Sequence, residues 1–226
     1  MWSNGNHYFY KEHKMKKMLL KTTFVAFSAL FAVNSTSFAA NPVEGKEYTT
    51  VRQAPSAQKE VLEFFSFYCP HCYDFELNYK IPAQIKANLP EGTKLVQYHV
   101  NFLGRQSENL TRAWAFAMAQ GVEDKVKTAL FEGAQKDAFK SMDDIKAVFV
   151  ANGVSAADFD NGINSFVVNG LVNKQVQAAE EFKIRGVPAF FVNEQYEINL
   201  SGFSDSTSTN DFIKRYVDAV TFLIKK

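Results

Sequence analysis

The chain has 226 residues, 46% of them hydrophobic and 22% charged, and its formal net charge is +1. This composition is that of an ordinary soluble globular protein, and the near balance of charge gives no indication of a nucleic-acid partner. The balance is uneven along the chain: residues 1–39 carry five Lys and one Glu, which leaves 20 basic and 23 acidic residues in the mildly acidic remainder.

Residues 1–39 are predicted to be a secretory signal peptide. Lysines that follow Met15 precede the apolar run 24–33, and small residues then lead to Ala39, where we expect cleavage. The alternative is a retained membrane anchor, but the run is shorter than the roughly 20 residues that span a bilayer. Met15 is the expected natural start, with residues 1–14 as an extra segment. Export would place the mature chain in an oxidising compartment, where two cysteines are paired unless something reduces them.

The next predicted elements are an edge strand and a central strand. Residues 47–51 alternate as a short edge strand does, and a loop over 55–59 leads to the aromatic and β-branched run 61–68, which predicts a buried strand. Glu63 is anomalous in this run, because a buried carboxylate is costly unless its pKa rises. It is either exposed at the end of the strand or buried with a raised pKa, and the residues alone leave both open.

The two cysteines of the chain, Cys69 and Cys72, follow the central strand. Pro70 suits the first turn of a helix, where its missing N–H costs nothing, so Cys69 is the expected N-cap. The N–H groups of His71 and Cys72 and the helix dipole would then favour a thiolate at Cys69. Because the thiolate is the nucleophile in disulfide exchange, the pattern predicts a redox-active pair.

A depressed pKa at Cys69 would decide the direction of the chemistry. Helix N-termini with a nearby cationic or polar His lower cysteine pKa values to about 3.5–7.5. A pKa of about 4 would stabilise the reduced form by roughly 4 kcal/mol at pH 7 and make the disulfide on the order of 90 mV more oxidising. Stabilising the dithiol therefore makes the disulfide a better oxidant.

Other interpretations of the cysteine pair have less support. A zinc site needs four ligands, and besides the cysteines only His71 and His99 remain once the N-terminus is removed. A c-type haem is excluded, because Tyr73 stands where C-x-x-C-H requires His. A purely structural disulfide that closes so small a loop would restrict the unfolded chain little. Redox catalysis is favoured, and no metal site is expected.

The helix after the cysteine motif is expected to present Cys69, Cys72 and Glu76 on one face. Pro82 should kink or end this helix, with a second piece over 83–88. A turn and a strand over 95–100 should follow.

Residues 104–170 have helical signals and no strand signals, so we expect an all-helical insertion. Gly121 is an expected helix stop. Two Ser–Asp pairs resemble capping boxes: Ser141 with Asp144, and Ser155 with Asp158.

The last part of the chain is predicted to return to the first domain. A helix over 171–182 leads to Pro188, which heads a strand over 189–192, since a proline is tolerated at a strand start. Asn193 and Glu194 should form a hairpin turn, although the Gly that suits a type I′ turn is missing. Asn210 is the expected cap of an amphipathic C-terminal helix whose apolar residues include Phe212, Tyr216, Val220 and Leu223.

Three stretches of the sequence resemble the DsbA family of the thioredoxin superfamily: residues 63–73, 97–102 and 185–189. A lone C-x-x-C is weak evidence, but Cys-Pro-His-Cys after a strand, with a distant Val-Pro-Ala, is highly specific. The resemblance begins near Tyr48 and extends to the end of the chain. It implies an α/β protein with a thioredoxin-like fold over 40–103 and 171–226, interrupted by an inserted all-helical domain over 104–170.

The resemblance also implies a function. The protein would be a periplasmic dithiol oxidase. It would donate the Cys69–Cys72 disulfide to reduced, unfolded secreted proteins through a mixed disulfide. The membrane protein DsbB, with a quinone behind it, would reoxidise the pair, and no bound cofactor is needed. A monomer is expected. Glu63 would be a buried acid that takes the Cys72 proton.

The resemblance implies that Pro188 is cis and lies opposite the redox cysteines. The backbone of Val187 would then be free to pair with an extended substrate peptide. One position departs from the family pattern: Gln97 stands where the family has a lysine near the buried glutamate. The departure removes a cation that would lower the Glu63 pKa, so the balance of buried charge is open.

Two alternative functions remain open. A disulfide reductase or isomerase shares the fold and the motif, although the Pro-His pair should favour an oxidant. A peptide-binding chaperone with incidental thiols is the contrasting class. A thiol-oxidation assay on a reduced, unfolded substrate separates the three.

Overall fold

The structure is a computed structural model that describes residues 41–226. The predicted signal peptide, its cleavage point after Ala39 and the expected start at Met15 therefore lie outside the described residues. Within 41–226, the helices are all too short or too polar to span a bilayer.

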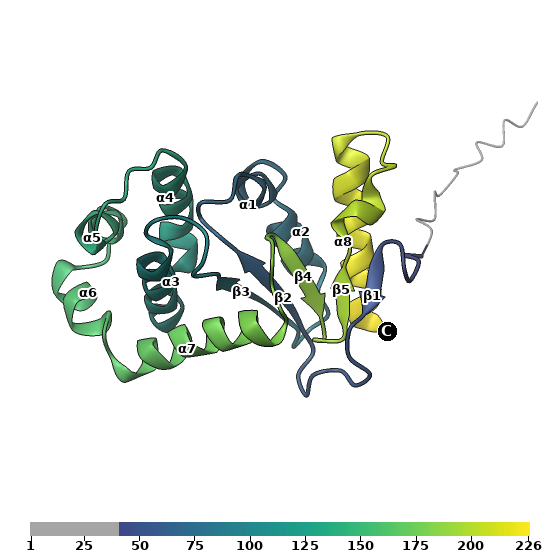
Figure 1. Cartoon of the computed structure of the whole chain (residues 1–226), viewed down its shortest axis with the longest axis horizontal. Coiled ribbons are helices and arrows are strands. Elements are labelled where there is room, and N and C mark those ends of the chain that lie inside the picture. Colours follow the sequence, from purple (N-terminus) through teal and green to yellow (C-terminus); the bar gives the residue numbers. More distant parts are fainter. Residues whose placement is uncertain (1–40) are drawn as a thin grey trace, which may run out of the picture. The chain divides into compact units, whose positions relative to one another are not determined.

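A five-stranded mixed sheet lies at the centre of the fold, in the order β1-β5-β4-β2-β3 (Figure 1). Its strands are β1 Tyr48–Thr50, β2 Glu60–Phe65, β3 Lys94–His99, β4 Ala189–Val192 and β5 Tyr196–Ile198. β2 pairs in parallel with β3 and antiparallel with β4, whereas β1 is an edge strand, as predicted. The run 61–65 is buried throughout, because helices cover both faces of the sheet at β2.

The helices are α1 Pro70–Tyr73, the π-helical turn η1 Asp74–Asn78, α2 Ile81–Asn88, α3 Ser107–Gln120, α4 Glu123–Gln135, α5 Met142–Ala151, α6 Ala156–Gly162, α7 Phe166–Glu181, the 3-10 turn η2 Leu200–Phe203 and α8 Thr209–Lys225. α2 and α8 pack together beside the sheet, and α3 to α6 form a separate helical group that α7 connects back to the sheet (Figure 1). This arrangement is a thioredoxin-like α/β fold with a helical insertion.

The central strand is shorter than predicted, because it ends at Phe65 and not at Tyr68. Ser66 causes this: its carbonyl oxygen accepts from the N–H of Cys69, and its hydroxyl accepts from the N–H of Tyr68. The resulting turn carries the chain from the end of the strand directly into the first helix at Cys69.

The predicted helix ends are partly confirmed. Gly121 ends α3 with φ 64°, and Ser141 with Asp144 forms a full capping box. Ser155 accepts from the N–H of Asp158 and so caps α6. The other outcomes differ from the predictions.

Asn210 does not cap the C-terminal helix. Ser208 does, because its side chain accepts from the N–H of Asp211. The break before α2 falls at Lys80, with φ 53°, and Pro82 lies in the first turn of α2, where a missing N–H is harmless.

The hairpin between β4 and β5 is confirmed without its glycine. Asn193 and Glu194 both have positive φ, 53° and 54°, as a type I′ turn requires. An ion pair between Glu194 and Arg52, 2.7 Å from Nη1 to Oε2, ties this turn to the segment after β1.

Helix α7 begins at Phe166, five residues before the predicted helix, with Ser165 as its N-cap. One continuous helix therefore crosses the predicted domain boundary between residues 170 and 171. The division into two domains stays a prediction.

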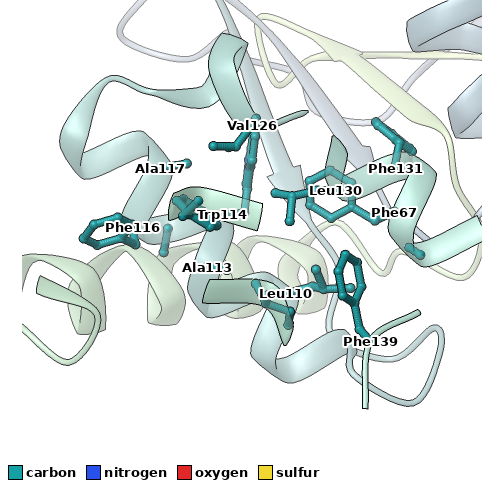
Figure 2. Close-up of a cluster of buried hydrophobic side chains, with 14 of the residues drawn as sticks. Phe67, Leu110, Ala113, Trp114, Phe116, Ala117, Val126, Leu130, Phe131 and Phe139 are labelled. Carbon is teal, nitrogen blue, oxygen red and sulfur yellow. The ribbon is translucent and has the colours of Figure 1, made fainter. Parts of the chain in front are cut away.

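Three hydrophobic clusters hold these layers together. Alternate residues of β2 face opposite sides, so that Val61 packs with α8 and Phe64 packs against α7. The third cluster fills the helical group (Figure 2). It also includes both cysteines. Within it, Phe67 and Trp114 are in contact with 5.7 Å between ring centroids. The helical group and the end of the central strand thus share one core.

A core substitution in the helical group should test its contribution to stability. Phe116 is fully buried against Phe149 and Phe159, so Phe116→Ala should lower the free energy of unfolding by about 3–5 kcal/mol. Phe166→Ala is the matched control, because that side chain is 92% exposed and its removal should change stability by less than about 0.5 kcal/mol. Denaturant unfolding measures both, and equal losses would contradict the packing described.

Candidate active site

Cys69 is the N-cap of α1, as predicted. Its backbone is extended (φ −86°, ψ 116°), and its sulfur accepts from the N–H of Cys72, with 3.3 Å between Sγ and N. Pro70 occupies the first helical position and His71 is exposed beside it. Both cysteines are free thiols in the structure, with Cys69 5% exposed and Cys72 fully buried.

The local hydrogen bonds stabilise the Cys69 thiolate. A hydrogen bond from the Cys72 thiol has the largest effect, and the N–H groups of Cys72 and His71 and the charge of His71 add to it against the opposing effect of burial. Together they lower the pKa of Cys69 to about 6. At pH 7 this stabilises the reduced form by about 1.4 kcal/mol, or about 30 mV, which is less than a pKa of about 4 would give.

Cys72 has the opposite tendency. Burial raises its pKa well above the ordinary value, and the neighbouring Cys69 raises it further, both through their hydrogen bond and through charge. Two cysteines only three residues apart therefore differ in chemistry: Cys69 is disposed to ionise, and Cys72 keeps its proton.

The Val187–Pro188 peptide is cis and lies beside the cysteines, as the resemblance implies. The Cys69 thiol donates to the carbonyl oxygen of Val187, with 3.3 Å between Sγ and O. Only the thiol form can make this bond, so ionisation of Cys69 releases the Val187 carbonyl. The sequence predicted that these two segments lie close together. It did not predict that the Val187 carbonyl oxygen accepts a hydrogen bond from Cys69 when both cysteines are reduced.

Glu63 is buried, with 1% of its surface exposed, which decides between the two states that the sequence left open. Burial raises its pKa to about 8, and the charge of Glu76 contributes in the same direction. Gln97 donates from Nε2 to Glu63 Oε2 at 2.7 Å, which opposes the rise. Glu63 is thus an acid that holds its proton near pH 7, and its charge also acts on Cys72.

A polar network extends from Glu63 to the helical group. Gln97 Nε2 donates to Glu76 Oε2 at 2.8 Å, and Lys127 Nζ donates to Gln97 Oε1 at 2.8 Å and to Glu76 Oε1 at 3.1 Å. The lysine that the family pattern places at position 97 is thereby replaced by one from another element. The sequence analysis did not predict a role for Lys127, although the spacing gave a signal. Lys127 lies three residues before Leu130, so both residues are on the buried face of α4.

His99 is placed away from this chemistry. It is buried, stacks on Phe67 with 5.0 Å between ring centroids, and shares a 2.8 Å hydrogen bond through Nδ1 with Thr111. Burial lowers its pKa to about 3, so it is neutral. Within residues 41–226 the structure contains no cluster of three or more potential metal ligands.

Comparison with known proteins gives consistent matches. The family model described as DSBA-like thioredoxin domain matches residues 60–216. The thiol:disulfide interchange protein DsbA of Haemophilus influenzae is 60% identical over 212 residues, 94% of this chain and 100% of that protein. The DsbA of Escherichia coli K12 is 45% identical over 209 residues, covering 92% and 100%.

Among solved structures, the complex of Proteus mirabilis DsbA with the non-covalently bound peptide PWATCDS matches with a TM-score of 0.76 and 45% identity. It covers 83% of this chain and 100% of that one. The disulfide oxidoreductase DsbA from the same organism, solved separately, matches with a TM-score of 0.75. The residues that the family model matches, 60–216, include the central strand, the cysteine motif and the cis-proline segment.

Alkylation of the reduced protein should distinguish the two thiols. Cys69 should react first, with a rate that rises through a midpoint near pH 6, because the thiolate is the reactive form. Peptide mass spectrometry after brief labelling gives the rate for each cysteine. In the Cys69→Ser variant, Cys72 should stay unlabelled in the folded protein. Preferential labelling of Cys72 would contradict this assignment.

The depressed pKa of Cys69 also predicts a pH-dependent stability. The unfolded value is 9.0 and the folded value about 6, so the contribution is complete above pH 9 and is lost as pH falls through 6. Between pH 6 and pH 8, the free energy of unfolding of the reduced protein should therefore rise relative to the oxidised protein. The rise should be at most about 2 kcal/mol, since solvent screens part of the effect.

Denaturant unfolding of both redox forms at several pH values measures this difference. Glu63 is buried in the same strand in both forms, so the part of its effect that does not depend on the Cys69 charge cancels in the difference. The Cys69→Ser variant under reducing conditions is the control, and it should show no rise against the same oxidised reference. If the stability of the unaltered reduced protein relative to the oxidised protein stays constant or falls between pH 6 and pH 8, the explanation is wrong.

Proposed function

The chain belongs to the DsbA family and is a thiol:disulfide oxidoreductase, and from this premise we propose that it oxidises newly exported, unfolded proteins by donating its Cys69–Cys72 disulfide. The observation that carries the proposal is the difference between the two sulfurs. Cys69 has a pKa lowered to about 6, whereas that of Cys72 is raised. A pair of this kind favours the reduced state, so its disulfide is an oxidant.

The reaction starts from the oxidised pair. A substrate thiolate attacks the sulfur of Cys69, a substrate–Cys69 bond forms, and the Cys69–Cys72 bond breaks. Cys72 leaves as a thiolate and takes a proton, which its raised pKa demands. We assign this proton to Glu63, which is mostly protonated at pH 7. The same carboxylate can take the proton back when the pair is reoxidised.

The second step releases the oxidised substrate. Another thiolate of the substrate attacks the substrate sulfur of the mixed disulfide, so that the substrate disulfide forms and Cys69 leaves as a thiolate. A leaving thiol of low pKa speeds this step. The N–H groups of His71 and Cys72 stabilise the departing charge. Two electrons pass from the substrate to the cysteine pair, and no bound cofactor takes part.

The backbone of Val187 is the proposed contact for the substrate peptide. Its carbonyl oxygen lies 3.3 Å from the Cys69 sulfur, and the side chain of Val187 is only half-buried. Pairing through the backbone selects little among sequences, which suits an enzyme with many unfolded substrates. The peptide bound to Proteus mirabilis DsbA supports a peptide ligand for this fold.

The cellular setting is part of the proposal. The signal pattern in residues 1–39 supports export, and a periplasmic location would supply unfolded chains with reduced cysteines. We assign reoxidation of the pair to the membrane protein DsbB and expect the enzyme to act as a monomer.

Anaerobic mixing of the oxidised protein with a reduced, unfolded protein that has two cysteines tests the function. One disulfide should appear in the substrate for each enzyme molecule consumed, as measured by thiol counting and mass spectrometry. Cys69→Ser should abolish the transfer, because it removes the sulfur that is attacked. If the reduced enzyme instead removes a disulfide from the folded substrate in the absence of other thiols, the protein is a reductase. If thiols do not exchange but aggregation is suppressed, it is a chaperone.

A further inference from the structure

We propose that Lys127 is a positioning residue that fixes the orientation of the Gln97 amide and thereby sets how readily Glu63 releases its proton. The inference rests on the proposed function in one respect: the proposed function has Glu63 pass that proton to Cys72. It concerns a side chain from the helical group that acts on the redox centre through other residues.

The hydrogen bonds of Gln97 permit one orientation. Lys127 can only donate, and it contacts Oε1 of the Gln97 amide at 2.8 Å. Nε2 therefore points to the other side, where it donates to Glu63 at 2.7 Å and to Glu76 at 2.8 Å. A flipped amide would set two donors against each other at Lys127 and two acceptors against each other at Glu76. Lys127 thus holds the donor end of Gln97 on Glu63.

This orientation acts on the proton of Glu63. A hydrogen bond donated to a carboxyl group stabilises its ionised form, whereas one accepted from it stabilises the neutral acid. While Lys127 engages Oε1, the amide of Gln97 can only donate to Glu63. Without Lys127 the amide is free to turn and accept from the protonated acid. The lysine therefore favours ionisation of Glu63 through Gln97.

The charge of Lys127 acts in the same direction. The groups whose charge acts on Glu63 come from several elements: Glu76 of η1 and Cys69 at the start of α1 raise its pKa, and Lys127 of α4 lowers it. Tyr216 of α8 also faces Glu63, but burial keeps this phenol neutral. Because the side chains of Lys127 and Glu76 are only 11% and 12% exposed, water screens this cation little.

Packing keeps Lys127 in place. Its Nζ lies 5.6 Å from the ring centroid of Trp114, a cation–π distance, and the indole of Trp114 donates to the backbone oxygen of Gln97 at 2.8 Å. The same two residues, Trp114 and Gln97, line a cavity of about 590 Å³ with Lys127 and Glu76. The network therefore joins the buried acid to a cavity that is lined by α2 and β3 on one side and by α3 and α4 of the helical group on the other.

Direct titration of Glu63 tests the proposal. The protein is labelled with 13C at the glutamate carboxyls and titrated by NMR in the reduced state, and the Glu63 signal is assigned by its loss in Glu63→Gln. Lys127→Met should raise the Glu63 midpoint by about one pH unit, because both the cation and the fixed amide are lost. Lys127→Arg keeps the charge and the donors, so its Glu63 midpoint should return most of the way to that of the unaltered chain. Lys125→Met, on the exposed side of the same helix, is the matched control and should leave the midpoint unchanged.

The outcomes separate this inference from the proposed function. If Glu63 titrates with a raised midpoint in the unaltered chain but does not move in Lys127→Met, the inference is wrong and the role of Glu63 stands. If Glu63 titrates near the ordinary value in the unaltered chain, the proton role proposed for it fails first. Should Lys127→Met not fold, Gln97→Leu keeps the Lys127–Glu76 pair and removes the amide, and its Glu63 midpoint should also rise. An unchanged midpoint there overturns the inference.

Discussion

The N-cap position of Cys69 is the constraint on which the site depends. The strand β2 ends at Phe65 because Ser66 takes over the next hydrogen bonds, and the chain then enters α1 with the Cys69 sulfur in the place of a capping oxygen. From that position the sulfur receives the N–H of Cys72, while Cys72 itself is carried into the core. One turn of backbone thereby gives two identical side chains different acidities, and disulfide exchange with a defined direction requires such a difference.

A buried acid beneath this turn is compatible with folding only because several elements share its cost. Glu63 lies between the apolar residues Leu62 and Phe64 in the buried part of β2, so its carboxyl group is desolvated and remains protonated near pH 7. Gln97 of β3 supplies a hydrogen bond, and Glu76 and Lys127 complete a network in which the polar atoms have partners. The network thus makes a buried carboxyl group tolerable in the core and also sets its pKa.

The helical group is a structural part of the redox centre. Its aromatic core continues into Phe67 at the end of the central strand, and Gln135 of α4 donates to the carbonyl oxygen of Phe67 at 2.8 Å. Lys127, from the same helix, reaches the network at Glu63. Both contacts converge on the segments that flank the cysteines. The insertion therefore positions the strand end and adjusts the charge beneath it, in addition to covering one side of the site.

The features that depend on neighbouring residues could be predicted from the amino-acid sequence. Strand formers before Cys69, Pro70 at the first helical position and the spacing to Cys72 predicted the N-cap thiolate, since capping is a local interaction. The fold class and the cis state of Pro188 came from resemblance, because local patterns do not encode them. The burial of Glu63, and the lysine of α4 that stands in for the cation absent at Gln97, became apparent only from the folded chain. Burial and long-range ion pairs join residues far apart in the chain, here 30 positions between Gln97 and Lys127, and no periodicity in the sequence specifies which of them will meet.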